Sequence, residues 1–176
     1  MKFNRLGNSD LQVSDVCLGT MTWGIQNTQQ DADEQMAFAL DKGVNFVDTA
    51  EMYPVPPNVD TYGDTERIIG NWISRNEAKR SDIVLMTKIA GSGLKYIRNA
   101  GPITADAIAN ALTYSLERLK TDYIDVYQLH WPNRVTPHFG KHWPDGADPT
   151  KTSREKELDG MRDILLGIKR ALDEGK

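Results

Sequence analysis

Four side chains that can exchange or direct a proton occur in this sequence, each near the end of a short apolar run. Asp48 and Tyr53 lie in "DTAEMYPVPPN", Lys88 in "IVLMTKI" and His130 in "IDVYQLH". A phenol is a weak acid, with an ordinary pKa of about 10, and a nearby ammonium group favours its deprotonated form. An aspartate can hold that ammonium group, and an imidazole can orient a polar substrate atom. Such groups together could protonate an alkoxide as it forms.

These residues meet only if the apolar runs that carry them become neighbouring strands. Four runs have strand length and are rich in β-branched residues. They are Val16–Thr20, Val44–Ala50, Ile83–Ile89 and Ile124–His130. Helical periodicity predicts a helix after each run, over Ala32–Lys42, Thr65–Arg75, Thr104–Leu119 and Asp159–Glu174. Four successive strand–helix units predict parallel strands, since the crossovers are right-handed.

Two architectures accept four such units, an open doubly wound sheet or part of an eight-stranded barrel. A dinucleotide-binding sheet would carry G-x-G-x-x-G after its first strand, and "LGTMTWG" does not supply it. A barrel places functional groups at the carboxyl ends of several strands, as here. The sequence therefore predicts one α/β domain over residues 1–176, with a hairpin over 1–15 and four βα units of a (β/α)8 barrel over 16–176.

Composition excludes several classes of partner. With 39% hydrophobic residues and a net charge of -4, the chain has no basic excess that would indicate nucleic acid binding. It has neither an apolar run of about 18 residues nor the apolar core of a signal peptide, which predicts a cytoplasmic protein without membrane contact. The single cysteine, Cys17, lies in the apolar run "VCLG" and is expected to be a small core residue.

The motifs "GTMTWG", "DTAEMY", "MTKI" and "QLHWP", in this order at successive strand ends, resemble the aldo-keto reductase family. The segments "EMYPVPP" and "GTMTWGIQN" are most similar to its bacterial Tas-type branch. This resemblance implies an NADP-dependent enzyme that reduces an aldehyde or a ketone on a (β/α)8 barrel, with NADP(H) as cofactor and without a metal. It also implies roles for four residues. Tyr53 would be the general acid, Lys88 the cation that eases release of its proton, Asp48 the partner of Lys88, and His130 the residue that positions the carbonyl oxygen.

Other residues are implied by the same resemblance. The cofactor-binding residues would be Thr20, Met21, Gln26 and Asp48. Trp23 and Trp131 would form apolar walls of the substrate pocket, as aromatic side chains often do. Ordinary packing in a βα turn stays an alternative for Met21, and for both tryptophans.

The segment Pro132–Glu157 lacks an apolar period and is longer than most connections. It is expected to be a substrate lid or a disordered insertion. His138 and His142 are spaced like a metal-binding pair on a helix, but the neighbouring prolines and glycine make a helix improbable there.

A barrel of this kind needs about 250 residues, so the chain corresponds to the N-terminal half of one. Half a barrel leaves two unpaired strand edges and an uncovered face. We therefore expect weak NADPH binding, and either self-association or a partner that carries the C-terminal half. Two other functions stay open, a non-catalytic cofactor-binding or regulatory subunit of the same fold, and a metal-dependent hydrolase using Asp48, Glu51 and His130.

Overall fold

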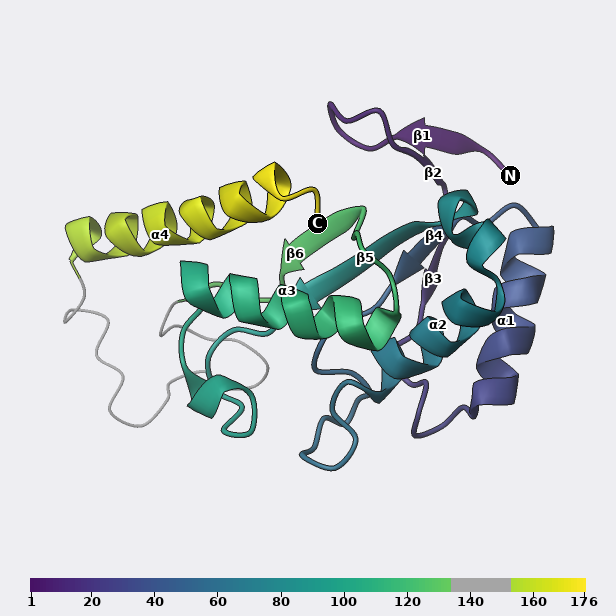
Figure 1. Ribbon diagram of the computed structural model, residues 1–176, viewed down its shortest axis with the longest axis horizontal. Coiled ribbons are helices and arrows are strands. Elements are labelled where there is room, and N and C mark those ends of the chain that lie inside the picture. The colour runs from purple at the N-terminus through teal and green to yellow at the C-terminus, as the bar shows by residue number, and fades with distance from the viewer. Residues whose placement is uncertain (134–152) are drawn as a thin grey trace.

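The computed structural model describes residues 1–133 and 153–176 and contains two separate sheets. The antiparallel hairpin pairs β1 (Phe3–Arg5) with β2 (Gln12–Ser14). The parallel sheet has the strand order β3-β4-β5-β6, as expected for four consecutive βα units of a barrel (Figure 1). Its strands are β3 (Cys17–Gly19), β4 (Phe46–Asp48), β5 (Val84–Ile89) and β6 (Val126–Leu129). Each strand lies inside one of the four predicted runs.

Residues 1–133 and 153–176 form four α-helices that follow the strands in turn, and two of the predicted starts agree closely with the structure. The helices are α1 (Gln29–Asp41), α2 (Asp64–Arg75), α3 (Ala105–Leu119) and α4 (Arg154–Asp173). Two short 3₁₀ turns, η1 (Glu77–Asp82) and η2 (Arg98–Ala100), lie before β5 and before α3. In the described residues, no helix combines the length and the apolar character needed to cross a membrane.

Side chains cap the starts of α1, α3 and α4, whereas α2 begins after Gly63 without a side-chain cap. Thr104 caps α3 by accepting a hydrogen bond from the backbone N–H of Ala107. The helix α4 begins at Arg154, earlier than the predicted Asp159, because Ser153 caps it by accepting from the N–H of Lys156. Its first turn is polar and exposed, so no apolar period marked it in the sequence.

The core lies between one face of the parallel sheet and the helices α1, α2 and α3, which Figure 1 shows on the same side of the sheet. Val47 and Leu85, which pair across β4 and β5, point into it. Gly70 lets α2 approach α3 closely, because a Cβ at this position would overlap the backbone carbonyl of Arg118. This layer holds the strands in the register on which the site depends.

The opposite face of the sheet is the one that would face the inside of a barrel. Cys17 lies on it, in register with Phe46 and Val84, and is exposed. The prediction that Cys17 is a core residue is therefore wrong. An apolar run shows that a strand is buried on some face, but it does not show which face the helices leave open.

The hairpin covers the end of the sheet at which the strands begin. The N–H of Ser14 donates to the side-chain oxygen of Asn45, 2.8 Å away, and the N–H of Asn45 donates back to the hydroxyl of Ser14 at 3.1 Å. Asn45 immediately precedes β4. The carboxyl ends of the strands, at the other end, are therefore free of the hairpin.

Candidate active site

The four predicted residues meet at the carboxyl ends of the parallel strands. Asp48 is the last residue of β4, Lys88 is next to last in β5, and His130 follows β6 directly. Tyr53 lies in the loop after β4. Because Asp48 pairs with Met86, and Lys88 comes two residues after Met86, the two charged side chains extend from the same face of the sheet.

The ammonium group of Lys88 lies between the carboxylate and the phenol. Its nitrogen is 2.6 Å from the carboxylate Oδ1 of Asp48 and 3.4 Å from the hydroxyl of Tyr53. It also donates a hydrogen bond of 2.8 Å to the backbone carbonyl of Thr49. The side chain of Lys88 is only 8% exposed, whereas that of Asp48 is 21% exposed. The cation is thus held in a fixed position, largely shielded from water, next to the phenol.

His130 completes the group on the other side of Tyr53. Its ring lies edge-on to the Tyr53 ring, with 5.5 Å between the centroids, and 5.0 Å from the ring of Trp131. Burial, with a smaller contribution from the charge of Lys88, lowers the pKa of His130 from 6.5 to about 4. At neutral pH the imidazole is therefore uncharged, with one nitrogen that donates and one that accepts a hydrogen bond.

A cavity of about 390 Å³ opens beside Tyr53 and His130. The residues that line it are mostly apolar and include no aspartate, glutamate, lysine or arginine: Met21, Met52, Tyr53, Val55, Pro57, Ser92, Gly93, Leu94, His130 and Trp131. The hydroxyl of Tyr53 and the imidazole of His130 thus lie at the wall of an apolar cavity. Sites for small molecules are usually of this kind, with a few polar groups in a mostly apolar lining.

The other residues singled out in the sequence fall into different places. Met21 is half exposed and lines the cavity, as does Trp131. Thr20 is fully buried and donates its hydroxyl hydrogen to the backbone carbonyl of Asp48 at 2.7 Å, so its side chain supports the site from behind. Trp23 instead belongs to the core, where its indole N–H donates to Gln35.

Gln26 also lies away from the cavity. It is exposed and lines a separate shallow cleft together with Asp64 and Arg67. The reason is that the turn between β3 and α1 folds back on itself, with a bridge that pairs Trp23 with Asn27. The folded-back turn places Trp23 in the core and Gln26 at the surface. The residue types alone did not indicate this difference.

Sequence reasoning gave Glu51 only a role as a metal ligand. In the structure its carboxylate is buried and pairs with the guanidinium of Arg98 at 2.8 Å, while it accepts a hydrogen bond of 2.5 Å from the N–H of Ala90. Residues 1–133 and 153–176 contain no group of three or more His, Cys, Asp or Glu side chains arranged to hold a metal ion. His138 and His142 lie outside the described residues.

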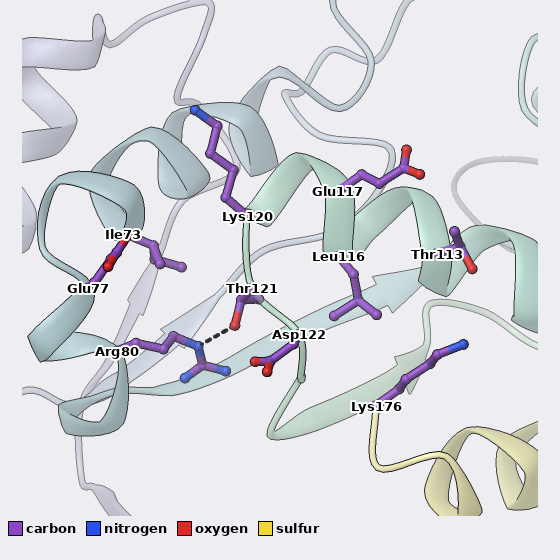
Figure 2. Close-up of a pocket in the computed structure, with 10 residues that line it drawn as sticks. All are labelled: Ile73, Glu77, Arg80, Thr113, Leu116, Glu117, Lys120, Thr121, Asp122 and Lys176. Atoms are coloured by element: carbon purple, nitrogen blue, oxygen red, sulfur yellow. Dashed lines mark hydrogen bonds between the residues drawn. The ribbon is translucent and has the colours of Figure 1, made fainter.

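A second, wider cavity lies at the opposite ends of the strands, between α2 and α3 (Figure 2). Its volume is about 820 Å³, and its lining includes the charged residues Glu77, Arg80, Glu117 and Lys120. None of the four site residues contributes to it. Of the four site residues, Tyr53 and His130 line the apolar cavity instead.

Comparisons of the whole chain with known proteins point to one family. A model of the aldo/keto reductase family matches residues 15–176. The chain is 43% identical to "Protein tas" of Escherichia coli over 153 residues, which is 84% of this chain and 44% of that protein. It is 37% identical to "Uncharacterized oxidoreductase YrpG" of Bacillus subtilis over 143 residues, which is 78% of this chain and 42% of that protein.

A solved structure shows the same arrangement of elements. It is that of "aldo-keto reductase AKR11C1 from Bacillus halodurans (holo form)", with a TM-score of 0.68 and 28% sequence identity. The match covers 99% of this chain and 47% of the other. The chain thus spans about half the length of the relatives that it matches. The half-barrel architecture predicted from the sequence is confirmed by this likeness.

Proposed function

Because this chain belongs to the aldo/keto reductase family, we propose that it carries the catalytic residues of an NADPH-dependent reductase that converts an aldehyde or a ketone into an alcohol. One observation carries this proposal. The hydroxyl of Tyr53 lies 3.4 Å from a buried ammonium group that Asp48 holds in place, at the wall of an apolar cavity.

Tyr53 serves as the proton donor. As the substrate's carbonyl oxygen gains negative charge, the phenol gives it a proton and is left as a phenolate. The ammonium group of Lys88 stabilises that phenolate, because opposite charges attract more strongly where water is largely excluded. Asp48 and the carbonyl of Thr49 keep the ammonium group from turning away. A general acid positioned in this way contributes a factor of about 10² to 10⁴ to turnover.

His130 orients the substrate. A neutral imidazole can donate a hydrogen bond to a carbonyl oxygen without adding a second positive charge next to Lys88. The lowered pKa of His130 keeps it in that neutral form across the physiological range. The carbonyl oxygen then lies between the imidazole and the phenol, whose rings are 5.5 Å apart.

The described residues fit the reactive end of a nicotinamide cofactor. Met21 offers a half-exposed apolar surface beside Tyr53 and His130, against which a flat ring can pack. Asp48 keeps part of its carboxylate accessible, where it can accept a hydrogen bond from a ribose hydroxyl. When bound, the nicotinamide supplies the hydride. The holo form of the similar Bacillus halodurans reductase supports a cofactor here, and the family resemblance supports NADPH.

The lining of the cavity indicates the class of substrate. An ionised carboxylate or phosphate would lose its water without gaining a charged partner among the lining residues, which is unfavourable. We therefore assign an uncharged aldehyde or ketone with an apolar substituent. A cofactor-binding subunit without activity would not need a proton donor coupled to a buried cation, so the geometry favours catalysis.

The test is a reductase assay of the full-length protein with benzaldehyde and 4-carboxybenzaldehyde, followed by the loss of NADPH absorbance. We expect kcat/KM for benzaldehyde to be about tenfold higher or more, the factor that corresponds to about 1.4 kcal/mol. Equal values for the two aldehydes would contradict the assignment of an uncharged substrate. No NADPH oxidation with any carbonyl compound would contradict the proposed reaction.

A further inference from the structure

A buried ion pair joins the two loops that flank the cavity. The side chain of Glu51 is 3% exposed and lies two residues before Tyr53. Its carboxylate binds the guanidinium of Arg98 at 2.8 Å and the N–H of Ala90 at 2.5 Å, and Arg98 donates in turn to the carbonyl of Ala90 at 2.6 Å. The N–H of Glu51 donates to the carbonyl of Lys88 at 3.1 Å. One carboxylate therefore ties together the Tyr53 loop, the end of β5 and Arg98.

The segment 91–97 is the part of the chain enclosed by these contacts. It begins after Ala90 and ends before Arg98, so the Glu51 carboxylate holds both of its ends. Its residues Ser92, Gly93 and Leu94 form one wall of the cavity. The far side of this wall is fixed by Trp131, whose indole N–H donates to the carbonyl of Ser92 at 3.1 Å.

The backbone at Arg98 needs such support. Arg98, Asn99 and Ala100 have φ values of 47°, 54° and 60°, three successive residues other than glycine in the left-handed region. A residue in this region is strained and stays there only where its surroundings hold it. The turn has local hydrogen bonds, from the N–H of Ala100 to the carbonyls of Ile97 and Leu94. Beyond these, the contacts of Arg98 with Glu51 and Ala90 anchor it to the rest of the fold.

We propose that the Glu51–Arg98 ion pair is a positioning device that holds the wall segment 91–97 against the Tyr53 loop and thereby sets the affinity for bulky apolar substrates. The proposal rests on the proposed function, since the cavity is taken as the substrate site. A bulky substituent contacts the wall, whereas a small aldehyde needs only the oxygen-binding groups, Tyr53 and His130. Loss of the ion pair loosens the wall, which weakens binding of the bulky substrate and leaves the proton donor in place.

The chain offers a matched control at the opposite ends of the strands. Asp125 accepts from the guanidinium of Arg80 at 2.9 Å and from the N–H of Leu85 at 2.9 Å, as Glu51 does from Arg98 and Ala90. Arg80 also donates to Thr121, the contact drawn in Figure 2. This second pair is also largely buried, but none of its residues lines the apolar cavity.

The experiment compares Glu51→Gln with Asp125→Asn in the full-length protein, using 4-isopropylbenzaldehyde as the bulky substrate and propanal as the small one. For Glu51→Gln we expect KM for the bulky aldehyde to rise about tenfold with kcat within about threefold, the pattern of lost substrate binding. KM for propanal should change by less than about twofold, as should both KM values of Asp125→Asn. Arg98→Lys, which keeps the charge, should show a smaller rise than Glu51→Gln. Equal KM changes in Glu51→Gln and Asp125→Asn would overturn the proposal.

A second measurement does not depend on turnover. Hydrogen exchange of the backbone amides in residues 91–97 should be faster in Glu51→Gln than in the parent protein, and unchanged in Asp125→Asn. Should the protein reduce neither aldehyde, the proposed function fails, and the exchange rates still decide the role of the ion pair. Unchanged protection of residues 91–97 in Glu51→Gln would overturn it.

Discussion

The hydroxyl of Tyr53 and the ammonium nitrogen of Lys88 lie 3.4 Å apart, although the two residues are 35 positions apart in the chain. The sheet creates this contact, because β4 and β5 are hydrogen-bonded neighbours that end at the same edge. Asp48, the residue that ends β4, binds the same ammonium group at 2.6 Å. The site is thus a direct consequence of strand order.

Lys88→Met should lower carbonyl reduction by about 100-fold or more, because the phenolate left by Tyr53 loses the charge that stabilises it. Asp48→Asn should lower it less, since the ammonium group stays but is held less firmly. Lys42→Met is the control, because Lys42 pairs with Asp41 on the surface. Initial rates with saturating NADPH test this, and melting curves verify folding. A Lys88→Met enzyme within about twofold of the parent would show that the cation is not used.

The stability of the protein should fall as the pH drops from 6.5 towards 4, in part because of His130. Its pKa is about 4 in the folded protein and 6.5 otherwise, so between these values the folded form binds fewer protons than the unfolded form. The contribution is intact above pH 6.5 and is lost on acidification, with a slope of at most about 1.4 kcal/mol per pH unit. Denaturant unfolding should be measured at several pH values. Between pH 6.5 and 4, the free energy of unfolding should change less steeply with pH in His130→Gln than in the parent protein. Identical slopes would contradict burial of the neutral ring.

Gly91→Ala should destabilise the protein by about 1–3 kcal/mol, the usual cost of overpacking. A Cβ at Gly91 would overlap the indole ring of Trp131, so the pocket wall has to shift. Gly160→Ala is the matched control, because a Cβ there meets no atom within 4 Å and Gly160 is inside α4. Gly160→Ala should stabilise the protein by about 0.5–1 kcal/mol, because alanine favours the helix more than glycine does. Urea unfolding distinguishes them, and a Gly91→Ala variant as stable as Gly160→Ala would refute the close contact.

The purified 176-residue chain should self-associate. Both β3 and β6 are edge strands, and Leu165 and Leu172 on α4 are mostly exposed. Each large apolar side chain left in water forgoes about 1.5–3 kcal/mol, which association can recover. Size-exclusion chromatography with light scattering over a range of concentrations tests this. A monomer of 19.8 kDa at every concentration that also binds NADPH tightly would contradict the expectation.

Residue types and periodicity were sufficient to predict the strand order and the meeting of Asp48, Tyr53, Lys88 and His130. The reason is that parallel strands place their carboxyl ends together whatever the details of the helices. The strands are shorter than the apolar runs that predicted them, as for β3, which covers only Cys17–Gly19. Hydrophobicity marks a buried stretch of chain, but hydrogen bonding to a neighbour decides where the strand ends.

Other features depend on contacts that no local pattern reveals. Glu51 and Arg98 are 47 positions apart, and their pairing requires the folded path of two loops. The positions of Trp23 and Gln26 were decided by a turn that folds back on itself. Exposure of Cys17 depends on which face of the sheet the helices cover. In each case the outcome depends on tertiary contacts between residues that are distant in the sequence.

The central claim is that Tyr53 donates the proton in carbonyl reduction, and Tyr53→Phe tests it most directly. In the full-length protein, reduction of benzaldehyde and binding of NADPH, followed by its fluorescence, should be measured on the same preparation. We expect turnover to fall by about 100-fold or more, because the proton donor is gone. NADPH affinity should stay within about threefold of the parent, since only the hydroxyl is removed. Near-normal turnover by Tyr53→Phe would contradict the account.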